Sequence, residues 1–462
     1  MASAEPERTV CVSPLWVISF WEYMARHRRY ALSVALGLVC AAAVHGESKA
    51  LKGFTLIDGT GMPPRVSAAM IVDDGRITWV GTSAQLKAPA GAETMDLRGA
   101  FVMPGIINLH GHIGNTVDLK QDAKFYTRES IQKNLATYAS YGVTTVLSMG
   151  TDQDLIFKVR QEQRAGRPGV TRVYTAGQGF VFKGGYGGLE GVTPGVATAA
   201  EADAAVGVQA NKGVDIIKLW LDDHLGEQKK MPYEIAKAII DSAHKHHLPV
   251  AAHIFYLEDA RRVVDYGVNG LAHSIRDKNV DDSLIAAMKK HGTWQLAPTL
   301  TREASMFVYA NTPPFVIDPF FTRSVPANVT EMLKSPAYQK SIAADPHFDR
   351  YRGFFEMAKK NLKKLAEVGV PYGFGTDTGP PGRFPGFFEQ WEMELMVDAG
   401  LTPMQVIVAA TGNAAKFLGT KELGTLEPGR WADLVVLESN PLADIKNTRS
   451  IRDVYIAGNR VH

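Results

Sequence analysis

The sequence predicts an α/β protein, a (β/α)8 barrel of the TIM type accompanied by a small β-sandwich domain that both ends of the chain build together. Three observations lead to this prediction. Apolar runs alternate with amphipathic segments through the middle of the chain, short runs separated by turns occur at both ends, and metal-binding side chains follow several of the central runs. Alternating strands and helices are typical of parallel β/α units.

The composition is that of a globular protein that acts on small molecules. The chain has 462 residues, of which 45% are hydrophobic and 21% are charged, enough for a barrel and a second, smaller domain. Its 50 basic residues nearly balance its 48 acidic residues, so the formal charge is only +2. This balance predicts no electrostatic affinity for nucleic acid and favours a small-molecule partner.

The first 46 residues differ from the rest and resemble a targeting segment. After Met24, an alternative start, a basic cluster precedes an apolar run from Ala31 to Val44 and a site of small residues. This order predicts a signal peptide over residues 1–46 and an exported protein, periplasmic or secreted. The apolar run is short for a membrane span, so we expect no membrane contact of the mature chain, although an N-terminal anchor is the alternative.

The cysteines restrict the metal chemistry that the mature chain can use. The chain has two, Cys11 and Cys40, and both lie in the predicted leader. A mature chain without them has no thiol for a disulfide or for a thiolate ligand. Any metal must therefore be held by histidine, carboxylate or a less usual ligand.

Residues 47–103 and 420–462 share the pattern of a small antiparallel β unit. Short apolar runs are separated by glycine-containing turns, which is typical of hairpins. The strands that we expect are Gly53–Ile57, Ala69–Val72, Ile77–Val80, Ala432–Leu437 and Ile451–Ala457. Because the two fragments flank a long middle region, we expect them to pair into one composite sandwich.

The middle of the chain, residues 104–419, predicts eight buried strands that alternate with helices. The strands are Val102–Leu109, Val143–Met149, Thr171–Ala176, Asp215–Leu221, Pro249–Ile254, Gly270–His273, Gln295–Thr299 and Tyr372–Gly375. The separating helices include Tyr233–His246, Glu258–Tyr266 and Tyr351–Val368. Residues 302–350, rich in proline and aromatic residues, indicate an insertion or lid. Eight strands favour a closed barrel.

Two histidines one residue apart, His110 and His112, end the first of these strands. Side chains at positions i and i+2 of an extended chain point the same way, so both imidazoles can bind one metal ion. In a (β/α)8 barrel the reactive groups collect at the carboxyl ends of the strands. The residues that we expect there are His110, His112, Lys218, His253, His273 and Asp377.

Each of these residues has a plainer interpretation when it is taken alone. A histidine that closes an apolar run is more often a hydrogen-bonded structural residue. Lys218 could be ion-paired, and Asp377, before a Pro-Gly turn, could cap a helix. Their order along successive strands is what favours a shared site.

The ordered set His-x-His, Lys, His, His, Asp resembles the amidohydrolase superfamily of metal-dependent hydrolases. Three framing sequences also match, namely Val102-Met-Pro-Gly, Gly375-Thr-Asp-Thr and the closing Leu423-Gly-Thr-Leu-Glu-Pro-Gly-Arg-Trp-Ala-Asp-Leu-Val-Val-Leu. The resemblance covers about residues 50 to 462. Within the superfamily, the chain is similar to the imidazolonepropionase-like and prolidase-like members, many of which cleave dipeptides or related amides.

The resemblance implies a site with two divalent metal ions. It assigns His110, His112 and Asp377 to a more buried ion, and His253 and His273 to a more exposed one. Lys218 would bridge the two as a carbamate formed with CO2, because an ammonium cannot bind a cation. Zinc is the metal expected first, although nitrogen and oxygen ligands also suit manganese and cobalt. Members of the superfamily frequently assemble, so a homo-oligomer is a further expectation.

Asp377 is the catalytic residue that this resemblance implies. Two metal ions lower the pKa of a shared water from about 15.7 towards 7, which makes it a nucleophile near neutral pH. Asp377 would accept its proton as a general base and deliver it to the leaving nitrogen as a general acid.

Three further residues are candidates for substrate binding or catalysis. Tyr256, three residues after His253, could donate a hydrogen bond to an oxyanion or simply cover the next helix. Arg276 could bind a substrate carboxylate or form a surface salt bridge. Tyr186 lies in a glycine-rich loop where relatives often carry histidine, so we place it in the substrate-binding set.

The predicted function is therefore a binuclear metal-dependent amidohydrolase that cuts an amide-type C–N bond. Its substrate would be a dipeptide, an N-acyl amino acid or a cyclic amide. One alternative is a mononuclear deaminase or cyclic-imidate hydrolase of the same fold, in which Lys218 is unmodified. The other is a non-catalytic binding protein that has kept the barrel.

Overall fold

The computed structural model describes residues 48–462, a mixture of helices and strands. The predicted leader at 1–46, with both cysteines, lies outside the described residues. Within residues 48–462, no helix is both long enough and apolar enough to cross a membrane.

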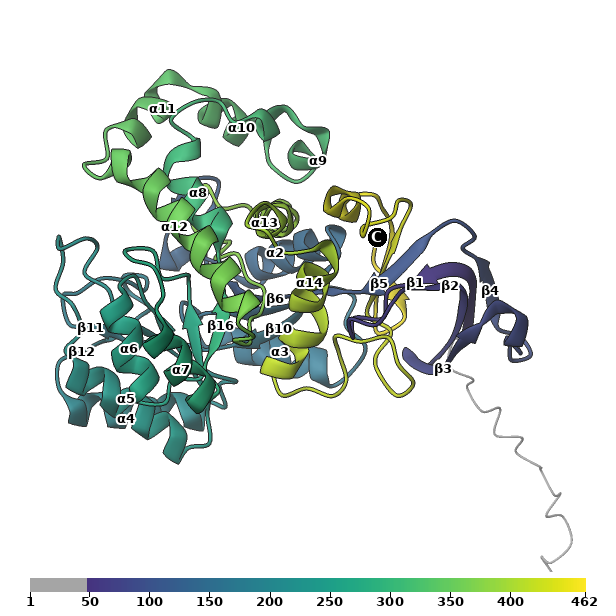
Figure 1. Ribbon diagram of the computed structural model, residues 1–462, viewed down its shortest axis with the longest axis horizontal. Helices are drawn as coiled ribbons and strands as arrows, with labels where there is room; N and C mark the ends of the chain where they lie inside the picture. Colours follow the sequence, from purple (N-terminus) through teal and green to yellow (C-terminus); the bar gives the residue numbers. More distant parts are fainter. Residues whose placement is uncertain (1–47) are drawn as a thin grey trace, which may run out of the picture. The chain divides into compact units, whose positions relative to one another are not determined.

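One sheet of eight strands combines the beginning and the end of the described chain (Figure 1). Its order is β19-β18-β17-β5-β1-β2-β3, and β4 also pairs with β1. The strands are β1 (Lys49–Leu56), β2 (Arg65–Asp73), β3 (Arg76–Thr82), β4 (Glu93–Asp96), β5 (Phe101–Pro104), β17 (Leu434–Leu437), β18 (Ile451–Ile456) and β19 (Asn459–Arg460). The five strands predicted at the two chain ends are thus present and share this sheet, while the sandwich arrangement and the domain boundaries stay predictions.

The long apolar run Val102–Leu109, predicted as one strand, is divided between two sheets. Strand β5 belongs to the eight-stranded sheet, and β6 (Ile106–Gly111) pairs with β9 (Val143–Ser148) in another. The division falls at Gly105, where an added Cβ would lie 2.1 Å from Thr144 Oγ1. The prediction of one continuous strand is therefore wrong, because hydropathy alone does not reveal this change of sheet.

Two parallel sheets hold the other central strands. Their orders are β10-β9-β6 and β13-β14-β15-β16. The remaining strands of these sheets are β10 (Arg172–Thr175), β13 (Ile217–Trp220), β14 (Val250–His253), β15 (Gly270–Ala272) and β16 (Trp294–Ala297). Most of their residues are buried, as expected for parallel strands covered on both faces. Six of the eight predicted central strands are confirmed, with small differences at their ends, and the second half of the first is present as β6.

The eighth predicted strand, Tyr372–Gly375, is not a regular strand. It is connected to β16 by a parallel bridge between Gln295 and Tyr372, and to β6 by a hydrogen bond of 2.8 Å from Leu109 N to Phe374 O. On the opposite side, a parallel bridge between Phe180 and Leu219 and a hydrogen bond of 2.8 Å from Asp215 N to Thr175 O join the region of β10 to that of β13. Irregular segments therefore lie between the two parallel sheets on both sides.

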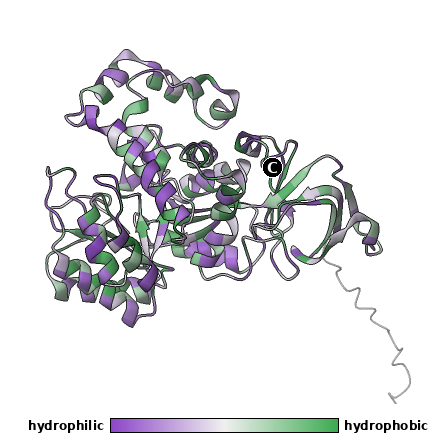
Figure 2. Cartoon of the chain, viewed as in Figure 1, coloured by the Kyte–Doolittle hydropathy of each residue, from purple (hydrophilic) through white to green (hydrophobic). Residues whose placement is uncertain are grey.

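Helices lie between these strands and after the last of them. They are α2 (Arg128–Ser140), α3 (Leu155–Arg164), α4 (Ala199–Asn211), α5 (Tyr233–Lys245), α6 (Leu257–Asp265), α7 (Asp282–His291), α12 (Phe348–Glu367), α13 (Phe387–Asp398), α14 (Pro403–Val408) and α15 (Ala414–Phe417). Along α12, hydrophobic and hydrophilic residues are interspersed (Figure 2), and its buried residues, such as Phe355 and Leu362, face the core. The three helices predicted by name are present, and α12 begins three residues early.

The predicted insertion at 302–350 is largely helical. It contains most of α8 (Leu300–Val308), then η3 (Pro314–Ile317), α9 (Pro319–Thr322), α10 (Ala327–Lys334) and α11 (Pro336–Ala343). Its aromatic residues pack with those of α13, as in the contact between the Phe321 and Phe387 rings at 5.0 Å. The smaller elements elsewhere are η1 (Ser83–Gln85), β7 (Thr116–Val117), β8 (Lys120–Gln121), η2 (Ala123–Phe125), β11 (Val181–Phe182), β12 (Gly195–Val196), η4 (Ala409–Asn413) and η5 (Ile445–Arg449).

Candidate metal centre and active site

Three side chains converge at the end of β6 and the segment beside it. His110 lies in β6, His112 follows it, and Asp377 follows the irregular segment at 372–375. Asp377 Oδ1 is 2.8 Å from His112 Nε2 and 3.4 Å from His110 Nε2. One potential ligand atom from each residue lies within 4.8 Å of the others, so this buried group could hold a metal ion.

Two more histidines lie beside this group. His253 ends β14 and His273 follows β15, and both are buried. The centroid of the His273 ring is 4.8 Å from that of His110 and 4.4 Å from that of His253. The His273 imidazole therefore lies next to both His110, from the first group, and His253.

Lys218, in the middle of β13, is wholly buried, and its Nζ has no hydrogen-bond partner among residues 48–462. Burial lowers the pKa of this amine from its usual 10.5 to about 7, although the charge of Asp377 opposes the effect. A large fraction of Lys218 is therefore neutral at neutral pH, when its amine has a free lone pair.

Three of the four histidines have one ring nitrogen fixed by a neighbouring oxygen. The pairs are His112 Nδ1 with Thr151 Oγ1 at 3.0 Å, His273 Nδ1 with Thr299 Oγ1 at 2.8 Å, and His253 Nε2 with Asp222 Oδ2 at 2.8 Å. Such contacts orient the rings and leave the other nitrogen for a ligand role. The fourth histidine, His110, has no hydrogen-bond partner for its buried Nδ1 within the described part of the chain.

Burial also sets the charge of these groups. It lowers the pKa of His253 to about 4 and holds those of His110 and His273 well below 6.5. Burial alone would raise the pKa of Asp377, but the charge of Arg383 and the hydrogen bond with His112 outweigh it and hold this pKa well below its usual value. Neutral imidazoles and an ionised carboxylate are the forms in which these residues bind metals.

The backbone is strained at three of these positions. Asp377, His273 and Thr299 have φ angles of +59°, +71° and +56°. Residues other than glycine seldom adopt this left-handed region, and such strain clusters at functional sites.

A cavity of about 530 Å³ opens onto the group. Its lining includes the four histidines, Asp377, Tyr186, Arg302 and Arg383. The structure thus brings Tyr186 into the site, where its ring centroid is 5.4 Å from that of His253. The ring of Tyr186 also stacks on His224, with centroids 5.3 Å apart and an interplanar angle of 6°.

Arg276 is buried. The alternative interpretation of this residue, a surface salt bridge, is therefore wrong. Its Nη1 donates to Ile254 O at 2.8 Å and to Ser274 O at 2.9 Å, and its Nε is 3.1 Å from Glu303 Oε2. It lines a second, smaller cavity of about 240 Å³.

Tyr256 is turned away from the site. Its hydroxyl donates to Asp223 Oδ1 at 2.8 Å, and the residue lines neither of these two cavities. The geometry therefore gives no support to Tyr256 as an oxyanion donor.

Sequence reasoning missed two arginines that contact Asp377. Arg302 Nε is 3.3 Å from Asp377 Oδ2, and Arg383 forms an ion pair with the same oxygen. Arg302 was assigned to the insertion, and Arg383 follows a Pro-Pro-Gly turn, so neither occupies a strand end. Asp222, which fixes His253, was also missed, although it directly follows the predicted strand Asp215–Leu221 and this position could have identified it.

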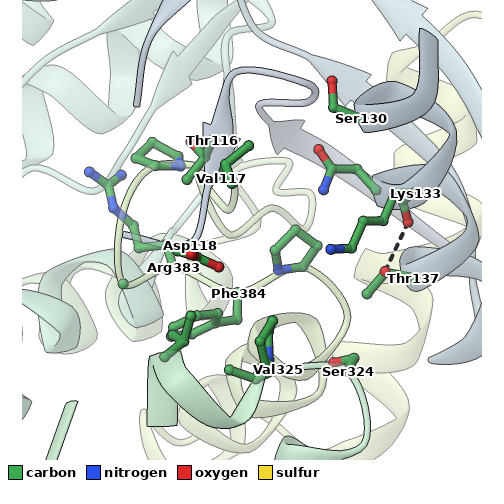
Figure 3. Close-up of a pocket in the computed structure, with 17 residues that line it drawn as sticks. Thr116, Val117, Asp118, Ser130, Lys133, Thr137, Ser324, Val325, Arg383 and Phe384 are labelled. Carbon is green, nitrogen blue, oxygen red and sulfur yellow. Dashed lines mark hydrogen bonds between the residues drawn. The ribbon is translucent and has the colours of Figure 1, made fainter. Parts of the chain in front are cut away.

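A further pocket of about 130 Å³ shares Pro380 and Arg383 with the histidine-lined cavity. In Figure 3 the guanidinium of Arg383 points away from Lys133. The charge of Arg383 is directed to Asp377, with which it forms an ion pair.

The donor set suits a divalent cation. It comprises three imidazoles held neutral, the imidazole of His112, one ionised carboxylate and one buried amine, and the buried His110 Nδ1 and Lys218 Nζ have no hydrogen-bond partner within residues 48–462. Nitrogen and oxygen donors of this kind bind zinc, manganese and cobalt.

A cluster of such ligands at the ends of parallel strands is characteristic of metal-dependent hydrolases. The chain belongs to the amidohydrolase family, whose model matches residues 101–461. This finding confirms the resemblance drawn from the sequence. It also confirms the prediction of a hydrolase and disfavours the non-catalytic alternative.

Named relatives agree with this assignment. The chain is 26% identical to ochratoxinase from Aspergillus niger, over 96% of this chain and 92% of that protein. It is 25% identical to imidazolonepropionase from Deinococcus deserti, over 85% of this chain and 92% of that protein. Among solved structures, a putative prolidase from Bifidobacterium longum matches with a TM-score of 0.72 and 26% identity, over 90% of this chain and 95% of that chain.

Proposed function

We propose that this protein is a binuclear metal-dependent amidohydrolase that cleaves the amide bond of a dipeptide or an N-acyl amino acid. The observation that carries the proposal is Lys218, a wholly buried amine without a hydrogen-bond partner in the described chain and with its pKa lowered to about 7. An isolated buried amine costs stability, so it needs a functional reason.

The scaffold of this enzyme is a closed (β/α)8 barrel. The bridges and hydrogen bonds on both sides of the two parallel sheets support a complete ring, in which Tyr372–Gly375 takes the eighth position. In such a barrel the ligands share the face that carries the active site.

Lys218 becomes a carbamate in this proposal. Its neutral Nζ attacks the carbon of CO2, a C–N bond forms, and one proton leaves the nitrogen. The product carries a negative charge and two oxygens, so it can bridge two cations as a carboxylate does.

The other ligands divide into two sets. His110, His112 and Asp377 would hold one divalent ion, His253 and His273 would hold the other, and the Lys218 carbamate would be a ligand to both. When bound, the two ions lower the pKa of water and polarise the substrate carbonyl. Zinc is the metal that we expect, and the export of the protein through residues 1–46 stays a prediction.

Asp377 moves the proton in the reaction. Its carboxylate accepts a proton from the attacking water while the water oxygen bonds to the carbonyl carbon, and it passes that proton to the leaving nitrogen as the C–N bond breaks. Because Arg302 and Arg383 contact its other oxygen, Oδ2, they keep the carboxylate ionised before the reaction begins. Tyr186 lines the cavity and is suited to contact the substrate.

The relatives support an amide substrate. Ochratoxinase, imidazolonepropionase and a putative prolidase are all similar to this chain over most of its length. A mononuclear deaminase or cyclic-amide hydrolase is the second candidate, because His110, His112 and Asp377 alone already form a group compact enough for one ion.

A library of dipeptides, N-acyl amino acids and cyclic amides tests the proposal on purified, metal-loaded protein. We expect hydrolysis of linear amides, and we expect Asp377→Asn to lower kcat by at least about 1,000-fold, since a general acid–base contributes about 100- to 10,000-fold and this residue is also a ligand. Circular dichroism should show that the variant remains folded. Turnover of cyclic amides or amines alone, or an Asp377→Asn variant with normal kcat, would contradict it.

A further inference from the structure

A second cavity, of about 240 Å³, adjoins the metal cavity and shares Tyr186, Arg302 and Arg383 with it. One wall is apolar and is formed by Leu225, Phe255, Met306, Tyr351 and Phe354. An apolar cavity of about 150 Å³ can hold a benzene molecule, so this volume is sufficient for an aromatic or large aliphatic group.

The apolar wall is built from aromatic rings that hold each other in place. The Phe255 and Phe354 rings meet edge to face, with centroids 4.9 Å apart and an interplanar angle of 89°. Phe255 follows His253 at the end of β14, whereas Phe354 lies on α12. The wall thus begins two residues from a proposed metal ligand.

Two guanidinium groups share one carboxylate at the junction of the two cavities. Glu303 pairs with Arg276 and with Arg302, and Asp377 pairs with Arg302 and with Arg383.

Asp222 also lines the second cavity, but its carboxylate is already engaged. Its Oδ2 contacts His253, and its Oδ1 accepts the backbone N–H groups of Asp223 and His224 at 2.7 and 3.1 Å. Once Asp377 binds a cation, Arg383 lacks a full carboxylate partner, while Arg302 keeps Glu303. A carboxylate from a ligand can complete this arrangement through charge-assisted hydrogen bonds.

We propose that the second cavity binds the side chain of the substrate's carboxyl-terminal amino acid, and that Arg302 and Arg383 bind its carboxylate. This inference rests on the proposed function and names its substrate class as N-acyl amino acids, or dipeptides, that end in an aromatic or large aliphatic residue. An α-amino acid carries its nitrogen, carboxylate and side chain on one carbon. The metal cavity, the arginine pair and the apolar cavity meet at Arg302 and offer one surface to each group.

Arg276, the residue that the sequence suggested for carboxylate binding, acts here as a positioning residue. Its Nη1 donates to Ile254 O and Ser274 O, and its Nε lies 3.1 Å from Glu303 Oε2, so it holds Glu303 in place, and Glu303 in turn holds Arg302.

Three small amides separate these contributions. N-acetyl-L-phenylalanine has both groups, N-acetyl-2-phenylethylamine lacks the carboxylate, and N-acetylglycine lacks the ring. We expect kcat/KM for the first to exceed that for each of the others by at least about 100-fold. Equal values would overturn the inference and leave the amidohydrolase function standing.

Variants assign the preferences to their residues. Arg383→Met should reduce the preference over N-acetyl-2-phenylethylamine by at least about tenfold, and Phe354→Ala should do the same for the preference over N-acetylglycine. Arg352→Met is the matched control, an exposed arginine on α12 that lines neither cavity, and it should keep both preferences. Unchanged preferences in Arg383→Met and Phe354→Ala would overturn the inference.

Calorimetric binding of the product L-phenylalanine gives a readout that does not depend on turnover. We expect the metal-loaded protein to bind L-phenylalanine at least about tenfold more tightly than Arg383→Met does, and more tightly than it binds glycine. If none of the three amides is hydrolysed, and no dipeptide or N-acyl amino acid of the library is hydrolysed either, the proposed function fails. In that case equal binding of L-phenylalanine and glycine would also overturn the proposed pocket.

Discussion

Lys218 lies in a strand where an apolar residue would be the stable choice. Its side chain is fully buried, and no hydrogen bond compensates for the lost hydration of its amine within residues 48–462. Functional sites often retain residues of this kind at a cost in stability. The free energy of unfolding of the metal-free protein should therefore reveal the cost.

Lys218→Met should stabilise the metal-free protein and weaken metal binding. The folded-state pKa of Lys218 is about 7, against 10.5 for an exposed lysine, so the contribution of the neutral amine to stability is lost as the pH falls from 10.5 to 7. Each pH unit of that difference corresponds to about 1.4 kcal/mol. We therefore expect the free energy of unfolding of the variant at pH 7 to exceed that of the wild type by a few kcal/mol. Thermal melting in excess chelator measures it, and a variant less stable than the wild type would contradict the account.

The buried histidines predict a second pH dependence, which has the same cause and the same sign as that of Lys218 but lies at lower pH. Burial, together with the charge of His253, holds the folded-state pKa of His273 well below 6.5. As the pH falls below 6.5, the unfolded chain binds a proton at this position that the folded chain does not, so stability is lost.

His273→Asn removes that contribution. Without metal, its melting temperature relative to that of the wild type should rise as the pH falls below 6.5. The comparison cancels other groups, such as Glu389, whose pKa is raised to about 6 by burial. A difference in melting temperature that stays constant from pH 7 to pH 5 would refute the assignment of a neutral His273.

At the scale of secondary-structure elements, α13 holds the two chain segments that present the first ligand group. Glu389 on α13 accepts hydrogen bonds from Asn108 Nδ2 at 2.7 Å, from Thr376 Oγ1 at 2.6 Å and from Thr378 Oγ1 at 2.8 Å. These partners flank His110 and Asp377 in sequence. One buried carboxylate therefore fixes the end of β6 relative to the irregular segment beside it.

Gly379 permits the same two segments to lie in contact. Its φ is +116°, and an added Cβ would lie 2.0 Å from His112 O. Gly379→Ala should displace His112, lower the metal content and reduce kcat/KM by at least about tenfold.

Gly382→Ala is the matched control for this prediction. Gly382 is in the same loop with φ +75°, but its nearest contact would be a side-chain atom of Tyr309 at 3.3 Å. Metal content and activity should then fall much less. Equal losses in the two variants would mean that backbone strain, and not contact with His112, explains the effect.

Strand ends were the predictable part of this site, and long-range contacts were not. His253 and Lys218 could be found because His253 ends a short apolar run and Lys218 interrupts another. Arg302 could not, because its place beside Asp377 depends on the start of α8. There Glu392, from α13, accepts the N–H groups of Leu300 and Thr301 at 2.8 and 2.7 Å.

At the scale of the whole molecule, the alternation of strands and helices was sufficient to predict six central strands and the participation of both chain ends in one sheet. It could not predict that one apolar run passes from one sheet to another at Gly105. Nor could it predict that Tyr372–Gly375 is joined to its neighbours only irregularly, through an isolated bridge and single hydrogen bonds. Both exceptions lie beside His110 or Asp377. Local hydropathy cannot reveal them, because neighbouring strands and not the segment itself determine their backbone.

The number of metal ions per chain tests the central claim most directly. The protein, purified and then reconstituted with excess zinc and bicarbonate, should contain about two ions per chain by elemental analysis. Lys218→Met should contain about one or fewer under the same conditions. One ion per wild-type chain, or two ions retained in Lys218→Met, would contradict a pair of cations bridged by Lys218.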